Sequence, residues 1–166
     1  MQLTGEYAQT YQIIGQIGAG GGGIIFKAFH TRLQKYVVLK KIHDSGSYNL
    51  AVVRREADIL KNLRHSYLPQ VYDFLILDTG VFTVMDYIPG QSIKEIMKSG
   101  YRFSEKEIVR LGSQLCEALA YLHMQKPAII HGDIKPANVM ITPQGNVCLI
   151  DFNISSTAGA DNRAYV

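Results

Sequence analysis

The stretch His131–Asn138, HGDIKPAN, decides the interpretation of this chain, together with Asp151 further on. Asp133 can orient a hydroxyl nucleophile and accept its proton, and Lys135 can neutralise charge on a phosphoryl group in transfer. Asn138 and Asp151 offer hard oxygen ligands, of which magnesium takes only a few because it keeps most of its waters. The spacing of these four residues therefore indicates phosphoryl transfer.

The composition is that of a globular chain of one domain or two small lobes. Its 166 residues are 47% hydrophobic and 19% charged, and the net charge of +3 is too small to indicate nucleic-acid binding. No apolar run reaches the ~18 residues of a membrane span, and the amino terminus shows no secretory signal. We therefore expect a cytoplasmic protein without nucleic-acid partners or a membrane segment, whose Cys116 and Cys148 are buried, reduced thiols.

Strand patterns fill the first half of the chain. Apolar and β-branched runs predict five strands, at Tyr11–Ile17, Ile24–His30, Lys35–His43, Val71–Leu77 and Val81–Tyr87. Between the third and fourth of these, the helical spacing of apolar residues predicts a helix over Leu50–Leu63. Pro89 and Gly90 then mark a break, so we expect one unit over residues 1–88 and a second over 89–166.

Helix patterns open the second half. A short helix is expected over Ser92–Ser99. A long one begins after Ser104, which forms a capping box with Glu107, and runs to about Gln125. The apolar face of the long helix consists of Ile108, Leu111, Leu115, Leu119 and Leu122. Two short strands then flank a turn, at Val139–Ile141 and Val147–Ile150.

Glycines at positions 18, 20 and 23 separate the first two predicted strands. A dinucleotide site would need a helix after such a pattern, whereas here Ile24 and Ile25 begin a strand. Strand, glycines and strand form a flap that can lie over phosphates, although the same residues also suit an ordinary hairpin turn. Lys40 and Glu56 are each a common surface charge when taken alone, but together they provide a cation for phosphates and an anion that holds it.

In the order of these motifs the sequence resembles the eukaryotic-type protein kinase family, of the serine/threonine branch and in a bacterial form. The resemblance implies an α+β fold, with a five-stranded antiparallel N-lobe that carries one helix, followed by the first part of a helical C-lobe. Lys135–Pro136 is the pattern of the serine/threonine branch. The implied reaction transfers a phosphoryl group from ATP, with Mg²⁺, to a serine or threonine of a protein substrate.

The same resemblance implies a role for each residue of the site. Asp133 is the catalytic base, and Lys135 contacts the γ-phosphate. Asn138 and Asp151 bind magnesium, and His131 braces the loop. In the hinge between the two lobes, Met85 is the gatekeeper, and the backbone of residues 86–88 forms hydrogen bonds with adenine. The implied nucleotide-binding residues are Ile17, Gly18, Gly20, Gly23, Ile25, Lys40, Glu56, Met85, Asp86 and Ile88.

The sequence departs from the family pattern at four points. Gly132 stands where an arginine usually pairs with a phosphorylated activation loop, so we expect activity that does not depend on that pairing. Asn153 replaces the usual glycine, and Gly22 should leave the flap less rigid. The sequence also stops at Val166, inside the activation segment. This predicts a fragment with weak or no turnover, which self-associates through exposed apolar surface.

Two other interpretations stay open. Small-molecule phosphotransferases resembling aminoglycoside and choline kinases share His-Gly-Asp, a following Asn and a downstream Ile-Asp-Phe. Lys135–Pro136, the full glycine loop and the short interval to Asp151 speak against them. The non-enzymatic interpretation is a kinase fragment that binds a nucleotide or a partner without transferring phosphate.

Overall fold

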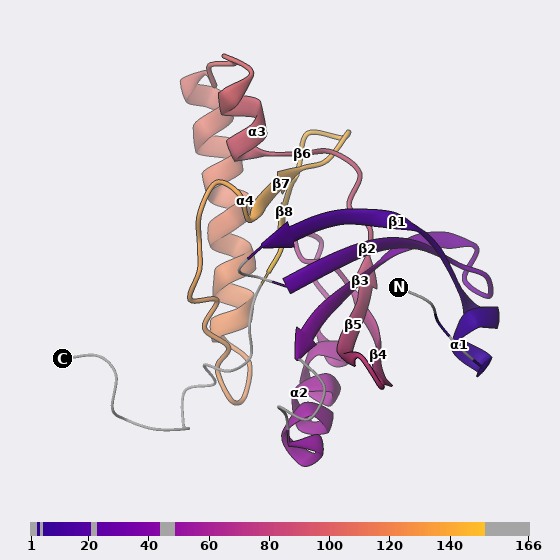
Figure 1. Ribbon diagram of the computed structural model, residues 1–166. Coiled ribbons are helices and arrows are strands. Elements are labelled where there is room, and N and C mark those ends of the chain that lie inside the picture. The colour runs from indigo at the N-terminus through magenta and orange to yellow at the C-terminus, as the bar shows by residue number, and fades with distance from the viewer. Residues whose placement is uncertain (1–2, 4, 21–22, 44–48, 152–166) are drawn as a thin grey trace. The chain divides into compact units, whose positions relative to one another are not determined.

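The computed structural model describes residues 3, 5–20, 23–43 and 49–151, and the chain divides into two compact units (Figure 1). One unit comprises residues 1–63 and 70–87, and the other comprises residues 64–69 and 88–166.

Residues 64–69 belong to the second unit, whereas a single division at residue 88 would put them in the first. The Arg64 N–H donates to Tyr121 Oη at 2.8 Å, and the Leu149 N–H donates to the Tyr67 carbonyl at 2.8 Å. These bonds join residues far apart in the sequence, so no local composition change marks this boundary.

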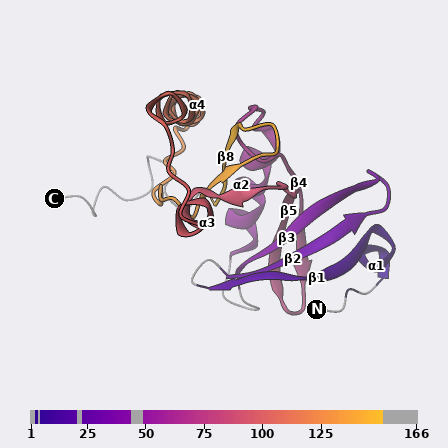
Figure 2. The same cartoon turned by 90° about the horizontal axis from the view of Figure 1, so that it is seen from above.

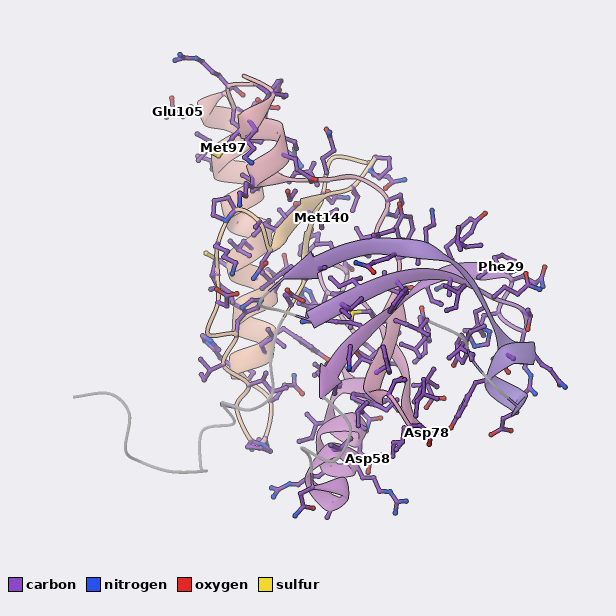
Figure 3. The ribbon with its side chains drawn as sticks, in the orientation of Figure 1. Phe29, Asp58, Asp78, Met97, Glu105 and Met140 are labelled. Carbon is purple, nitrogen blue, oxygen red and sulfur yellow. The ribbon has the colours of Figure 1, made fainter. Side chains whose placement is uncertain are left out.

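The first unit is built on a five-stranded antiparallel sheet, as predicted. Its strands are β1 (Tyr11–Gly20), β2 (Gly23–His30), β3 (Lys35–His43), β4 (Val71–Leu77) and β5 (Gly80–Asp86), in the order β1-β2-β3-β5-β4. Helix α2 (Leu50–Asn62) begins at Asn49, whose side chain accepts the Ala51 N–H at 2.9 Å. Gly80, at φ +128°, helps to turn the chain between β4 and β5, where Asp78 is exposed (Figure 3).

One face of this sheet carries a hydrophobic core. Its buried residues are Leu3, Tyr11, Ala28, Val37, Leu39, Leu75, Phe82 and Val84. The structure adds a second helix to the one predicted for this unit, the short α1 (Gly5–Thr10), which lies beside β1 (Figures 1 and 2). Six residues are too few to show a helical period, and long-range contacts secure them. Tyr7 packs on the core, and Thr31 Oγ1 donates to the Gln9 carbonyl at 2.9 Å.

The second unit combines a small sheet with two helices. The helices are α3 (Ile93–Lys98) and α4 (Glu105–His123), and the sheet consists of β6 (Gln91–Ser92), β7 (Val139–Ile141) and β8 (Val147–Leu149) in that order. The predicted capping box is confirmed: Ser104 Oγ accepts the Glu107 N–H at 3.4 Å, and Glu107 Oε2 accepts the Ser104 N–H at 2.8 Å. Strand β6 is an addition to the prediction, because two residues show no alternation.

Helix α4 buries a narrow stripe of its surface. Leu111 and Leu122 are buried, whereas Ile108, predicted on the apolar face, is 58% exposed. Cys148 is buried as expected, but Cys116 is exposed, which corrects the expectation of two buried thiols. At about 100° per residue, Cys116 lies roughly 140° around the helix from Leu111 and so turns away from the buried stripe. None of the helices in the described part of the chain is long and apolar enough to cross a membrane.

Candidate active site

The glycines of the predicted flap end β1 and begin β2. Gly20 pairs with Gly23 and Gly18 pairs with Ile25, so the chain continues as a strand, as predicted, and not as the helix of a dinucleotide site. Gly23 has φ +96°, and a Cβ there would collide with a carbonyl oxygen of β3, so only glycine fits. The tip of the flap, with Gly22, lies outside the described residues.

Lys40 projects from β3 on the face that carries Ile25. The two residues are direct cross-strand partners, and Thr83 of β5 is the partner of Lys40 on the other side. Lys40 is only 7% exposed, and a buried ammonium needs anionic or polar partners. Glu56, the predicted anion, belongs to α2, but its side chain lies outside the described residues, so the pairing stays a prediction.

Met85, the residue expected to be the gatekeeper, lies on the same face of the sheet. Met85 is two positions along β5 from the cross-strand partner of Lys40, and alternate residues of a strand share a face. Asp86 is the last residue of β5, and Ile88 begins the longer of the two segments that form the second unit. Ile17, near the end of β1, is 51% exposed. The first unit therefore brings the predicted phosphate lysine and gatekeeper to one face.

The loop over residues 131–138 brings two of the predicted residues to the carboxylate of a third, Asp133. Lys135 Nζ lies 2.6 Å from Asp133 Oδ2, and the Asn138 side-chain amide donates to the same oxygen at 2.9 Å. A further bond of 2.9 Å joins that amide to the Asp133 carbonyl. The hydrogen bond from Lys135 first, and then that from Asn138, holds the pKa of the Asp133 carboxyl below its usual value. Asp133 is therefore ionised and ready to accept a hydrogen bond from a hydroxyl group.

His131 is buried and holds this loop in place through its ring, as expected. The ring is 2% exposed, and its Nδ1 accepts the Asp133 N–H at 3.3 Å. Nε2 therefore carries the proton and donates to the Ile150 carbonyl at 3.0 Å. Burial lowers the pKa of His131, so the imidazole is neutral at pH 7. This ring positions Asp133 through its main chain.

Asn138 and Asp151 are brought together by a main-chain hydrogen bond. The Ile150 N–H donates to the Asn138 carbonyl at 2.9 Å, which places the next residue, Asp151, beside Asn138. The amide nitrogen of Asn138 faces Asp133, so its oxygen, a hard donor of the kind that Mg²⁺ takes, turns away from Asp133. The described residues contain no group of three or more His, Cys, Asp or Glu placed to hold a metal ion. Asn153 lies outside them.

Two features are typical of one class of protein, the phosphotransferases of the kinase type. One is a sheet that presents a buried lysine, and the other is a loop that presents Asp133, Lys135 and Asn138. A sequence model described as the protein kinase domain matches residues 11–165. The chain therefore belongs to the protein kinase domain family.

Curated relatives come from the serine/threonine branch that the motifs imply. The chain is 30% identical over 158 residues to the probable serine/threonine-protein kinase of Clostridium perfringens, covering 93% of this chain and 23% of that protein. It is 34% identical over 156 residues to a serine/threonine-protein kinase of Myxococcus xanthus, with 89% and 28% covered. It is 32% identical over 167 residues to the human serine/threonine-protein kinase tousled-like 1, with 93% and 22% covered. The chain thus spans about a quarter of the length of these relatives.

Proposed function

We propose that this chain transfers the γ-phosphoryl group of Mg-ATP to a serine or threonine hydroxyl of a protein substrate. The observation that carries the proposal is the Asp133 carboxylate, held at 2.6 Å by Lys135 and at 2.9 Å by Asn138 in a chain of the protein kinase family. A carboxylate that two donors keep ionised and oriented can accept the hydrogen bond of a hydroxyl and then its proton.

The two oxygens of Asp133 are not equivalent. Lys135 and Asn138 both bond Oδ2, so we assign Oδ1 to the incoming hydroxyl. The side chains of Lys135 and Asp133 are 51% and 49% exposed, so a phosphoryl group can reach the ammonium while the loop stays folded. Lys135 can therefore orient the base and neutralise phosphoryl charge from one position.

The chain offers groups suited to each part of the nucleotide. The main-chain N–H groups of the glycine strands and the buried Lys40 ammonium suit phosphate oxygens, and the hinge backbone suits adenine. When bound, magnesium neutralises phosphate charge. Asn138 and Asp151 are the residues that would hold it, and their oxygens are the hard donors it prefers.

We infer that activity does not require a phosphorylated loop. Gly132 offers no cation, so the usual pairing with a phosphate cannot form there. The hydroxyl residues that follow Asp151 in the sequence, Ser155, Ser156, Thr157 and Tyr165, lie outside the described residues. Rates measured before and after phosphatase treatment should be equal, and a large loss would refute the inference.

Transfer of labelled phosphate from ATP to a generic protein substrate tests the proposed function. We expect slow but measurable labelling by the wild-type chain and a loss of at least about 100-fold in Asp133→Asn. Lys61→Met, which breaks an ion pair of 2.7 Å between α2 and β4, is the control and should keep the wild-type rate. Labelling that does not depend on Asp133 would refute the assigned base.

Thermal shift with Mg-ATP separates binding from turnover. A shift without labelling of any protein would reduce the function to nucleotide binding, which is the fragment interpretation. The absence of a shift would refute the use of ATP. Labelling of an aminoglycoside in place of protein would favour the small-molecule interpretation, against which the names of the three relatives speak.

Self-association is proposed for the exposed surface of α4. Ile108 and Val109 are 58% and 66% exposed, which gives the helix an apolar surface. Sedimentation velocity should show a mean mass that rises with concentration, and Ile108→Lys should reduce the rise. A wild-type chain that stays monomeric at high concentration would contradict the proposal.

A further inference from the structure

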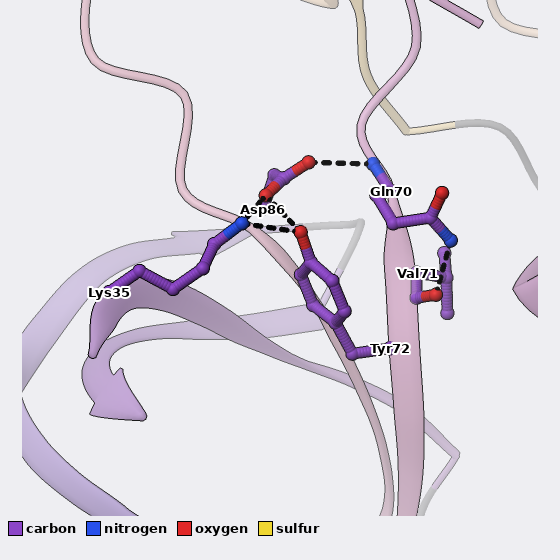
Figure 4. A network of polar contacts seen from close by, with 5 residues as sticks. All are labelled: Lys35, Gln70, Val71, Tyr72 and Asp86. Atoms are coloured by element: carbon purple, nitrogen blue, oxygen red, sulfur yellow. Dashed lines mark hydrogen bonds and ion pairs between the residues drawn. The ribbon is translucent and has the colours of Figure 1, made fainter. Parts of the chain in front are cut away.

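Asp86, the last residue of β5, is the centre of a polar network (Figure 4). Its Oδ1 lies 2.7 Å from Lys35 Nζ and accepts the Tyr72 hydroxyl at 2.5 Å, and Lys35 Nζ also donates to Tyr72 Oη at 2.5 Å. Its Oδ2 accepts the Gln70 N–H at 2.9 Å, and the Asp86 N–H donates back to the Gln70 carbonyl at 2.9 Å. Lys35 begins β3 and Tyr72 belongs to β4, so two strands restrain one residue of a third, β5.

The network is charged and partly shielded from water. The Asp86 side chain is 24% exposed and that of Lys35 is 40% exposed. Burial alone would raise the pKa of Asp86, but the hydrogen bonds from Lys35, Tyr72 and Gln70 outweigh it, and the pKa lies below its usual value. Burial would likewise lower the pKa of Lys35, and its bonds to Asp86 and Tyr72 raise it instead. Both groups are therefore ionised at neutral pH, and their contacts are charge-assisted.

Tyr87 is restrained from the opposite face, since successive residues of an extended chain point to opposite sides. Lys27 Nζ lies 4.0 Å from the centroid of the Tyr87 ring and 4.4 Å from that of the Tyr36 ring, so one cation sits between two aromatic rings. These two rings also meet edge to face, with centroids 6.4 Å apart. The two consecutive residues at the start of the hinge are thus anchored from both faces of the sheet.

We propose that Lys35, Tyr72 and Lys27 are positioning residues that fix the backbone of Asp86 and Tyr87 for binding of the adenine base. The inference rests on the proposed use of ATP. Main-chain groups bind a base more tightly when they are already ordered, because ordering them during binding costs free energy. Side chains that reach the hinge from the two faces of the sheet keep its main chain ordered, and the main chain binds the base.

Adenosine binding by the full chain tests the proposal, because adenosine has the base and no phosphates. In calorimetry, Lys35→Met should weaken the Kd for adenosine about five- to tenfold, the range of a modest coupling between sites. Tyr72→Phe keeps the ring and removes only the hydroxyl, so a smaller loss of about two- to threefold is expected, in line with one hydrogen bond. Lys35→Arg should restore binding, since a guanidinium group can also bond the carboxylate.

Mg-tripolyphosphate is the complementary probe, because it has phosphates and no base. It should bind Lys35→Met and Tyr72→Phe as tightly as the wild-type chain. Lys61→Met is the matched control: Lys61 Nζ lies 2.7 Å from Asp73 Oδ1, and the two side chains are 37% and 43% exposed, similar to the hinge pair. The control should leave adenosine binding unchanged. Lys27→Met should weaken adenosine binding about twofold, since a cation–π contact at an exposed site is weak.

The outcomes separate this inference from the proposed function. A wild-type chain that binds adenosine, with variants that bind it equally well, overturns the positioning role and leaves ATP use intact. Equal weakening of adenosine and tripolyphosphate also overturns the positioning role, because the network would then support only the fold. A wild-type chain that binds neither adenosine nor ATP overturns the proposed function and this inference with it.

Discussion

Replacing His131 with phenylalanine should destabilise the second unit, because two partly buried main-chain groups lose their partner. Phenylalanine keeps a ring of similar shape in a site that is 2% exposed, so the change leaves little cavity. It removes the acceptor of the Asp133 N–H, at 3.3 Å, and the donor to the Ile150 carbonyl, at 3.0 Å.

The magnitude follows from these two bonds. A buried donor or acceptor left without a partner costs about 1–3 kcal/mol. Both groups are partly buried, so water offsets part of each loss, and the loop relaxes around both. We therefore expect a loss of about 1–3 kcal/mol, against the roughly 5–15 kcal/mol that stabilises a typical domain.

Urea unfolding at pH 7.5, followed by circular dichroism, measures this loss. The control is His123→Gln, because His123 is exposed in the last turn of α4 and a surface change there should stay within about 0.5 kcal/mol. A loss of less than about 0.5 kcal/mol in His131→Phe would refute the bracing role.

The same variant should also change how stability depends on pH. Burial lowers the pKa of His131, and also that of His30, below the ordinary value of 6.5. As the pH falls through 6.5 the unfolded chain therefore takes up these protons first, so stability is complete above that pH and declines below it. His131→Phe removes one of the two contributions. Its stability should decline less steeply than that of the wild-type chain, and an equal slope would contradict the reasoning.

Four other substitutions probe the loop, the long helix and the glycine strands. Lys135→Ala removes the ammonium that lowers the pKa of Asp133, so the acidic limb of the kcat/KM profile should move to higher pH; an unmoved limb would argue against Asp133 as the base. Ser104→Ala removes the cap of α4 and should cost about 1 kcal/mol in urea unfolding, and a loss near zero would show that the box is dispensable. Gly112→Ala, with no atom within 4 Å of the added Cβ, should stabilise α4 by up to about 1 kcal/mol. Gly23→Ala should destabilise, because its φ is +96° and the Cβ collides with backbone, and a neutral result would contradict that geometry.

Local patterns predicted most of the first unit. The spans 35–43 and 71–77 agree with β3 and β4 residue for residue, because alternation and a short turn are properties of neighbouring residues. The start of α4 was equally local, since Ser104 and Glu107 form their box within one turn. The grouping of Lys135 and Asn138 around Asp133 followed from spacing within one loop.

Contacts between distant residues account for what the sequence did not predict. Lys35 and Asp86 are 51 positions apart, and each resembles an ordinary surface charge in its own stretch. Helix α1 is too short to show a period and depends on Tyr7 packing against the sheet. Residues 64–69 join the second unit through contacts such as the hydrogen bond from the Arg64 N–H to Tyr121 Oη, which no local pattern predicts. In each case the structure depends on a contact with a residue that is distant in the sequence.

Gly132 holds a left-handed φ of +74° immediately before Asp133. A residue with a side chain would lose about 1–2 kcal/mol in that conformation, and glycine avoids this loss. An arginine introduced here would therefore add a charge that can bind phosphate and at the same time lower the stability of the loop. In this chain, sensitivity to a phosphorylated segment and stability of the loop are opposed at one residue.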